Sequence, residues 1–342
     1  MEYNYKKISE SLLKGLPPRT TNVVERRFGL KSGERETLEA IGQSYGITRE
    51  RVRQIEEEGL KSCREKSQKY GDVFKYFRET LKGFGEIKKE GALLSALGGE
   101  KNQNQIYFLL FLNDDFKRIQ EDGNFHTLWT NSQESSKSAR KAVELILNKL
   151  KSEKVLLDLD KLFNANKSET EKAAAKKMNK EFFASYLEIS KDIQQNHEGQ
   201  YGLKSWLEIN PKGIKDKAYL VLKKEQKPLH FSEVASGIDA AFASSKRKAH
   251  LATVHNELIK DQRFVLVGRG MYALKEWGYF PGIVKDVIYK VLKESQVPMT
   301  KEEITEKVMK QRLVKPNTVL LNLQDKNLFV KNESGKYQVR EA

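Results

Sequence analysis

The sequence predicts a mainly α protein with small β-hairpin wings, organised as one helix-turn-helix domain followed by about four winged-helix domains. Residues 37–65 have the pattern of two helices joined by a tight turn. After residue 70, an order of three helices and a hairpin recurs four times, which is typical of an array of small domains. A chain of 342 residues is also too long for one small domain.

The helix-turn-helix prediction rests on apolar spacing and on the residues of the turn. Apolar residues recur at helical spacing at Leu38, Ile41 and Tyr45 in the first helix and at Val52, Ile55 and Leu60 in the second. Gly46 suits the unusual backbone angles of a tight turn, and Thr48 is placed to cap the second helix. Arg51 stands where a capping box would have Glu or Gln, so an ordinary cap is expected.

Four polar side chains remain on the exposed front of the second helix: Arg49, Glu50, Arg53 and Gln54. The second helix of a helix-turn-helix enters the major groove with its N-terminus first. Arg and Gln suit contacts with the edges of guanine and adenine, and Glu can accept a hydrogen bond from cytosine. The pattern therefore predicts DNA reading by this helix. The alternative is a solvated, charged helix in an ordinary bundle.

Three motifs in residues 10–68 are long enough to be specific. They are Leu16-Pro17-Pro18-Arg19, Arg27-Phe28-Gly29-Leu30 and the run GITRERVRQIE at residues 46–56. These motifs closely resemble region 4 of the sigma-70 family of transcription initiation factors, which reads the promoter −35 element and rests on the flap of RNA polymerase. The resemblance implies base reading by Arg49, Glu50, Arg53 and Gln54, and DNA backbone or positioning contacts by Arg19, Thr48 and Arg51.

The resemblance covers about a sixth of the chain, and only about ten residues precede it. A counterpart of the region that melts and holds the −10 element is therefore not expected. We predict a borrowed promoter-reading module and not a complete sigma factor.

The basic surplus lies mainly at the two ends of the chain. The 62 basic and 47 acidic residues give a net charge of +15, divided as +4 in residues 1–70, +1 in residues 71–210 and +10 in residues 211–342. A basic surplus favours polyanionic partners. The ends are therefore expected to bind nucleic acid, and the middle is not.

Several classes of protein are excluded by what the sequence lacks. A single cysteine, Cys63, rules out a disulfide framework and a cysteine metal cluster, and it is expected to serve in packing. No apolar run approaches the ~18–20 residues that span a membrane, and no signal peptide is evident, so we expect a cytoplasmic, nucleoid-associated protein. The five histidines lack metal-ligand spacing, and no phosphate-binding loop or nucleophile elbow is present. We therefore expect no enzyme activity, no cofactor, no metal and no small-molecule substrate.

The predicted domains span residues 1–69, 70–131, 137–208, 209–279 and 280–342. In the first two winged helices we expect helices over residues 71–82, 85–99, 102–112, 139–151, 157–165 and 180–187, with hairpins turning at Asp122-Gly123 and Glu198-Gly199. The charged, alanine-rich residues 167–180 are predicted to be a solvated helical extension. The alternative for them is an arm that binds nucleic acid.

In the last two winged helices we expect helices over residues 214–224, 230–242, 248–260, 283–294, 300–312 and 316–326, with hairpins turning at Gly268-Arg269-Gly270 and Ser334-Gly335. Each domain is predicted to end on an aromatic residue in its last strand: Trp129, Trp206, Trp277 and Tyr337. We expect these aromatic side chains to seal the wing to the helices. The alternative is base stacking.

The third winged helix carries a second resemblance. The segments AYLVL at 218–222, PLHFSEVA at 228–235, TVHNEL at 253–258 and residues 264–277 look like the HARE-HTH winged-helix domain, over residues 209–278. That family is generally regarded as DNA- or polymerase-associated. A sigma region 4-like domain joined to a HARE-HTH domain resembles bacterial sigma-like transcription regulators.

Basic residues flank the third helix and the hairpin of this domain: Lys246, Arg247, Lys248, Arg263 and Arg269. Winged helices often place the third helix in the major groove and the wing over the backbone, so the set is a candidate phosphate clamp. Lys310, Arg312 and Lys315 precede the third helix of the last domain in the same way. The alternative for both sets is that these loops are merely basic.

Together these patterns predict a sequence-specific DNA-binding transcription factor that acts in bacterial transcription initiation or its regulation. Its expected partners are double-stranded DNA and the RNA polymerase core, with no membrane. One alternative is a polymerase-associated adaptor that binds protein surfaces; another is the DNA-recognition subunit of a restriction or defence system. Steep salt dependence of duplex binding would separate the DNA readers from the adaptor.

Overall fold

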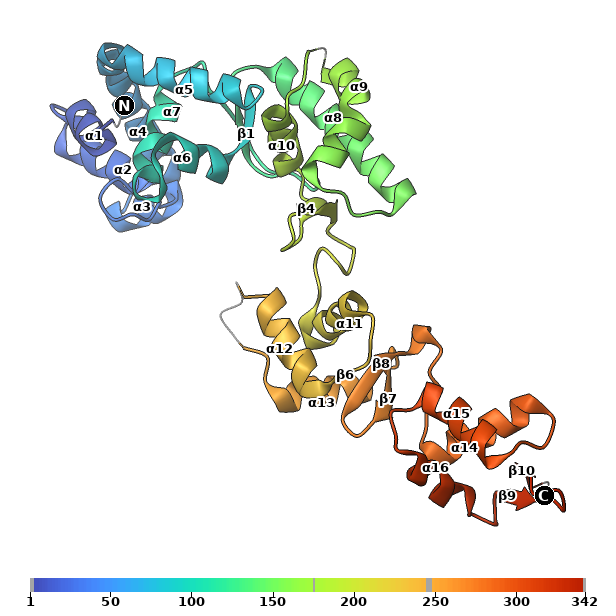
Figure 1. Cartoon of the computed structure of the whole chain (residues 1–342). Helices are drawn as coiled ribbons and strands as arrows, with labels where there is room; N and C mark the ends of the chain where they lie inside the picture. Colours follow the sequence, from blue (N-terminus) through green and yellow to red (C-terminus); the bar gives the residue numbers. More distant parts are fainter. Residues whose placement is uncertain (1–2, 175, 244–247, 341–342) are drawn as a thin grey trace. The chain divides into compact units, whose positions relative to one another are not determined.

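The computed structural model describes residues 3–174, 176–243 and 248–340. The chain forms two compact parts, an N-terminal part, Met1–Ser205, and a C-terminal part, Trp206–Ala342. Figure 1 shows helices throughout both parts, with short paired strands among them. The predicted fold class, mainly α with small β-hairpin wings, is confirmed.

The N-terminal part begins with four helices that contain the predicted helix-turn-helix. They are α1 (Tyr5–Leu13), α2 (Pro18–Phe28), α3 (Leu38–Tyr45) and α4 (Arg49–Ser67). Pro18 is the first residue of α2, where its fixed φ suits a helix and its missing N–H costs no hydrogen bond. Gly46 ends α3 with a φ of 65°, a left-handed conformation that glycine adopts without steric penalty. The two helices predicted in residues 37–65 are thus confirmed as α3 and α4.

Winged unit 1, residues 71–130, follows after a short 3-10 turn. Its elements are α5 (Gly71–Gly83), β1 (Ile87–Lys89), α6 (Glu90–Gly98), α7 (Gln103–Leu112), β2 (Lys117–Ile119) and β3 (Leu128–Thr130). The prediction of one helix over residues 85–99 is wrong, because β1 pairs with β3 as a strand before α6 begins. Gly85 has a φ of 77°, and this left-handed residue turns the chain between α5 and β1.

Winged unit 2, residues 133–203, has longer helices than predicted. Its elements are α8 (Gln133–Glu153), α9 (Leu159–Ala174), α10 (Lys180–Ile189), β4 (Ile193–Gln195) and β5 (Tyr201–Leu203). The predicted solvated extension over residues 167–180 is wrong in its first half, because α9 continues through it against α8. Thr170 on this stretch is fully buried and donates its hydroxyl to the carbonyl oxygen of Asn166. Ala175, in the middle of the predicted extension, lies outside the described residues.

The C-terminal part contains winged units 3 and 4. Winged unit 3, residues 213–277, consists of α11 (Gly213–Glu225), β6 (Leu229–His230), α12 (Phe231–Ala241), α13 (Leu251–Lys260), β7 (Phe264–Gly268), β8 (Met271–Leu274) and the 3-10 turn Lys275–Trp277. Winged unit 4, residues 284–339, consists of α14 (Val284–Ser295), α15 (Lys301–Gln311), α16 (Pro316–Leu323), β9 (Phe329–Lys331) and β10 (Tyr337–Val339). The four hairpins lie where the turn residues predict them.

One strand-pairing rule holds in all four winged units. The segment between the first and second helices pairs with the last strand of the hairpin, which gives the sheet orders β1-β3-β2 and β6-β8-β7 in units 1 and 3. In units 2 and 4 the same pairing shrinks to a single bridge, Leu157 with Tyr201 and Met299 with Tyr337. The repeats predicted from sequence therefore share one topology, including a pairing that the sequence did not predict.

Winged unit 1 and the helix-turn-helix share one hydrophobic core. A continuous cluster of buried side chains runs from Tyr5 and Leu12 on α1, through Cys63 on α4, to Phe108 on α7 and Trp129 on β3. α7 packs against α1, α2 and α4, as Figure 1 also shows for α7 and α4. Cys63 is fully buried, as its predicted packing role requires, and burial raises the pKa of its thiol to about 11.

The aromatic residues predicted to close each unit have unequal positions. Trp129 lies in β3, fully buried, and its indole Nε1 donates to a carboxylate oxygen of Glu90 at 2.9 Å. Tyr337 lies in β10. The prediction that Trp206 and Trp277 lie in the last strand is wrong, because β5 and β8 end before them; Trp277 instead packs on the core of unit 3 from a 3-10 turn.

Two buried tyrosines of the N-terminal part should respond in opposite ways to loss of their hydroxyl. The Tyr186 hydroxyl on α10 has no hydrogen-bond partner among the described residues, and burial raises its pKa to about 12. The Tyr5 hydroxyl donates to the carbonyl oxygen of Leu97 at 2.8 Å. A buried polar group without a partner costs about 1–3 kcal/mol, whereas a made hydrogen bond contributes about 1 kcal/mol. We expect Tyr186→Phe to raise, and Tyr5→Phe to lower, the free energy of unfolding measured in urea. Equal effects from both would contradict this assignment.

Candidate nucleic-acid interface

A small apolar core holds α4 against α2 and α3. Val23, Ile41, Val52 and Ile55 are buried where the three helices meet, with Leu38, Tyr45 and Ile47 packed around them. Two glycines permit the close approach. A Cβ on Gly42 would lie 2.8 Å from the carbonyl oxygen of Ile47, and a Cβ on Gly59 would lie 2.8 Å from a methyl of Thr20. The position of α4 is therefore fixed by backbone contacts as well as by side chains.

The N-terminus of α4 is fixed by the predicted cap. The backbone N–H of Arg51 donates to the Thr48 hydroxyl oxygen at 3.2 Å, and Thr37 caps α3 through the N–H of Ala40 at 3.1 Å. A side-chain cap satisfies one of the N–H groups that the first turn of a helix leaves unpaired. Thr48 therefore orients the first turn, on which the predicted base-reading residues stand.

The four predicted base-reading residues, Arg49, Glu50, Arg53 and Gln54, are all exposed on the first two turns of α4. Beneath them, Val52 and Ile55 face the core. This arrangement gives one polar face with both hydrogen-bond donors and acceptors, which is the property that reading base edges requires.

Neighbouring charges hold these side chains in place. The Arg53 guanidinium lies 2.7 Å from Glu50 and 2.9 Å from Glu57, and Arg51 donates to the Gln54 amide oxygen at 2.9 Å. The hydrogen bond from Arg53 holds the pKa of Glu50 below its usual value, and Glu50 raises the pKa of Arg53. Exposed ion pairs contribute little free energy, so a nucleic-acid partner can displace them.

Arg19, the predicted backbone contact outside α4, lies exposed at the start of α2. Its guanidinium stacks 5.0 Å from the ring centre of Tyr45, and Arg26 approaches the same ring at 5.8 Å. Arg26 also forms a two-pronged ion pair with Glu36 and donates to Ser44. Sequence reasoning identified Tyr45 only as an apolar position of α3. Its role as a platform for two arginines depends on how α2 and α3 cross.

The third helices of winged units 1 and 2 are buried within the N-terminal part. α7 contributes Ile106, Phe108, Leu109, Leu110 and Leu112 to the shared core. α10 packs on β1, where Lys88 is buried and lies 2.8 Å from Glu188, and Gly85 is so close that a Cβ would lie 3.1 Å from Phe182. The helix that a winged helix would place in the major groove is therefore covered in both units.

The third helices of winged units 3 and 4 have exposed faces. Lys248 lies exposed before α13, and Arg269 lies exposed at the tip of the β7–β8 hairpin. Neither forms an ion pair with another described residue. Lys246 and Arg247, which belong to the same predicted set, lie outside the described residues.

Two arginines of the predicted basic sets are committed to the protein itself. Arg263 forms ion pairs with Asp261 at 2.7 Å and with Asp216 at 2.9 Å, and Asp261 raises its pKa. Arg312 is 5% exposed and donates to the backbone carbonyls of Leu266 and Gly282. The prediction of free phosphate contacts by these two arginines is wrong, because basic loop composition does not reveal an acidic or carbonyl partner distant in sequence.

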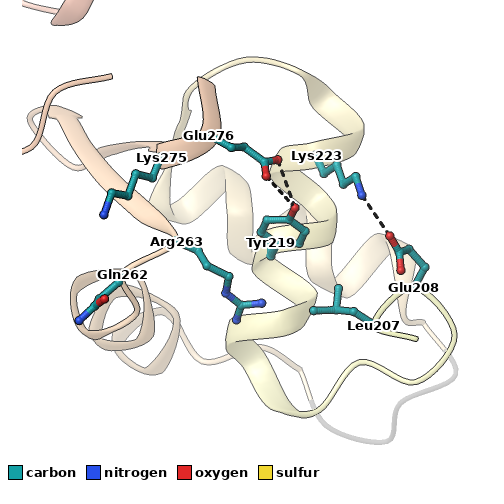
Figure 2. Close-up of a pocket in the computed structure, with 8 residues that line it drawn as sticks. All are labelled: Leu207, Glu208, Tyr219, Lys223, Gln262, Arg263, Lys275 and Glu276. Carbon is teal, nitrogen blue, oxygen red and sulfur yellow. Dashed lines mark hydrogen bonds and ion pairs between the residues drawn. The ribbon is translucent and has the colours of Figure 1, made fainter. Parts of the chain in front are cut away.

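Winged unit 3 also has an open hollow of about 660 Å³ beside α11, lined by Leu207, Glu208, Tyr219, Lys223, Gln262, Arg263, Lys275 and Glu276. Figure 2 shows Tyr219 bonded to Glu276 and Lys223 bonded to Glu208, at 3.1 Å and 3.0 Å. These pairs neutralise most of the lining charge, so the hollow lacks a concentrated site for an anion or a cation.

Metal-binding clusters and membrane-spanning helices are both absent from the described part of the chain. Within residues 3–174, 176–243 and 248–340, no group of three or more His, Cys, Asp or Glu side chains is placed to hold a metal ion. Across the same ranges, every helix falls short of the length and apolar character that crossing a bilayer demands.

Comparison with known proteins identifies two segments. Residues 12–65 match the family model for Sigma-70, region 4, and residues 213–277 match the model for HARE-HTH, an HTH domain described for ASXL and restriction endonuclease proteins. RNA polymerase sigma factor SigA of Nostoc sp. (strain PCC 7120 / SAG 25.82 / UTEX 2576) is 47% identical over 55 residues, which are 16% of this chain and 14% of that protein. The chain thus matches a small fraction of the curated relative's length. Both families are DNA-binding helix-turn-helix domains and not enzymes. The chain therefore joins a DNA-binding helix-turn-helix of the sigma-70 region 4 type to a HARE-HTH winged helix.

Proposed function

We propose that this protein is a sequence-specific DNA-binding transcription factor that reads a −35-type promoter element with α4. One observation carries the proposal. Arg49, Glu50, Arg53 and Gln54 stand together on the exposed first two turns of a capped helix whose opposite face is buried. A helix fixed by its core and cap can present donors and acceptors to base edges without a large loss of conformational entropy on binding.

In this proposal, Arg19, Thr48 and Arg51 contact the DNA backbone around α4. Lys248 and Arg269, with Lys246 and Arg247 beside them in the sequence, add backbone contacts from winged unit 3. Winged units 1 and 2 serve as a rigid support for the helix-turn-helix, since their third helices are buried. The protein would act in the bacterial cytoplasm, at the nucleoid, with the RNA polymerase core as its second partner.

A second candidate, an adaptor that binds protein surfaces, is favoured by one specific observation. Large apolar side chains such as Ile259 and Leu321 stand exposed on α13 and α16, where a DNA reader would need polar groups. The two candidates are compatible if the two parts of the chain have different partners.

Selection of duplexes from a random library tests the first candidate. We expect the full chain to enrich a motif resembling a −35 element. The Arg53→Ala, Gln54→Ala double variant should bind that motif roughly five- to hundred-fold more weakly, because each good bidentate contact accounts for this much discrimination. It should bind unrelated duplexes nearly as well as the parent chain does.

The matched control is the Lys61→Ala, Arg64→Ala double variant on the exposed C-terminal half of α4. It should keep the motif preference, because α4 rises 1.5 Å per residue and these side chains stand about 15 Å from Arg53 along the helix. If both double variants lower binding to all duplexes equally, α4 is not a base-reading helix.

A further inference from the structure

Exposed apolar side chains are concentrated in the C-terminal part. Among the described residues, twelve large apolar side chains are strongly exposed, and ten of them follow residue 206. Residues 206–342 also carry 25 basic and 16 acidic side chains, a net charge of +9. Exposed apolar groups on a basic surface mark an interaction site and not a solvated scaffold.

Three of these side chains lie around a single buried guanidinium where winged units 3 and 4 meet. Arg312 donates to the carbonyl of Leu266 on β7 and to the carbonyl of Gly282, which precedes Ile283. The next residue, Leu313, donates its backbone N–H to the carbonyl of Val267 at 2.7 Å. Leu266, Ile283 and Leu313 are 46%, 64% and 51% exposed. They therefore form one exposed apolar cluster, the junction surface.

The junction surface has a basic rim. Arg269 follows Gly268, whose Cβ position would be 3.2 Å from the Cβ of Leu313, and Lys315 lies two residues beyond Leu313. Both cations are exposed, and neither forms an ion pair with a described side chain. The cluster exists only because unit 4 packs against the wing of unit 3, so neither winged unit alone would carry it.

We propose that the junction surface docks an acidic, partly apolar face of the RNA polymerase core, an inference that rests on the proposed promoter-reading function. An apolar centre with a basic rim is complementary to a protein surface that pairs apolar side chains with carboxylates. A nucleic-acid backbone offers no apolar area to cover Leu266, Ile283 and Leu313. A second copy of this chain would bring two basic surfaces together, which electrostatic repulsion disfavours.

The test measures binding of purified core RNA polymerase to the immobilised full chain, together with binding of the selected duplex. The Leu266→Ser, Leu313→Ser double variant changes two half-exposed side chains, so it should fold normally. It should bind core polymerase at least ten-fold more weakly than the parent chain and should bind the duplex within two-fold of it.

The chain offers a matched control in its N-terminal part. Leu145 and Val155 are 38% and 51% exposed, and the Leu145→Ser, Val155→Ser double variant makes the same chemical change away from the junction surface. It should leave polymerase binding unchanged. The docking proposal fails if the parent chain does not bind core polymerase, if both double variants bind it equally, or if the junction variant loses duplex binding in parallel. Failure of the promoter-reading proposal is distinct, since it would show as no motif in the duplex selection.

Discussion

Replacing Trp129 with alanine should lower the free energy of unfolding of the N-terminal part by about 3–5 kcal/mol, the usual cost of removing a large buried aromatic side chain. Trp129 makes edge-to-face contacts with Tyr107 and Phe111 on α7, and its indole N–H satisfies Glu90. Glu90 in turn forms an ion pair with Arg118 at 2.6 Å. The variant would therefore leave a cavity and a partly unsatisfied carboxylate beside the helix that supports the helix-turn-helix.

Urea unfolding followed by far-UV circular dichroism measures this effect, with duplex binding as a second readout. Because α7 belongs to the core that also holds α1 and α4, duplex binding should disappear at the urea concentration where the variant unfolds. Trp129→Phe, which keeps most of the volume, should cost less, and Trp206→Ala, outside this core, should leave the N-terminal transition in place. Duplex binding that survives after winged unit 1 has unfolded would show that the two do not share a core in solution.

Replacing Arg312 with alanine should destabilise the C-terminal part by about 2–3 kcal/mol. Its guanidinium is buried, burial lowers its pKa, and it satisfies two backbone carbonyls that belong to different winged units. Hydrogen bonds from a charged donor contribute about 1.5–3 kcal/mol, and carbonyls left buried without a donor add a penalty. We also expect the contact between winged units 3 and 4 to loosen.

Lys310→Ala is the control for Arg312→Ala. Lys310 lies two residues away on α15, is fully exposed and pairs only with Glu306 on the same helix, so its loss should hardly change stability. Thermal unfolding and limited proteolysis between residues 278 and 284 measure both variants. Equal stability and equal cleavage would show that Arg312 does not couple the two units.

Helices and turns were predictable because their signals are local. Thr37 and Thr48 cap their helices as their positions indicated, and Gly46 has the positive φ that the turn requires. Short strands were less visible. β1 has three residues and the equivalents in winged units 2 and 4 are single bridges, so no alternation of apolar and polar residues could reveal them.

The candidate site divides in the same way. The exposed face of α4 follows from helical spacing within one segment, so the four base-reading candidates could be named from the sequence alone. The partners of Arg263 and Arg312 come from other segments, up to 47 residues away, and only the tertiary fold shows that these arginines are already engaged. The burial of α7 and α10 likewise depends on packing between units. An apolar helix has the same sequence pattern whether it fills its own core or a neighbour's.

The shared core also sets an order of events during synthesis. The back of the helix-turn-helix, formed by α1 and the later turns of α4, is covered by α7, which ends at Leu112. A ribosome must therefore add more than forty residues after α4 is complete before this apolar face can be buried, and several seconds pass at ordinary rates of elongation. During that interval the nascent DNA reader exposes an apolar face that chaperones bind. A borrowed module has thus become dependent on the sequence that follows it, and it can no longer be transferred to another protein without its winged neighbour.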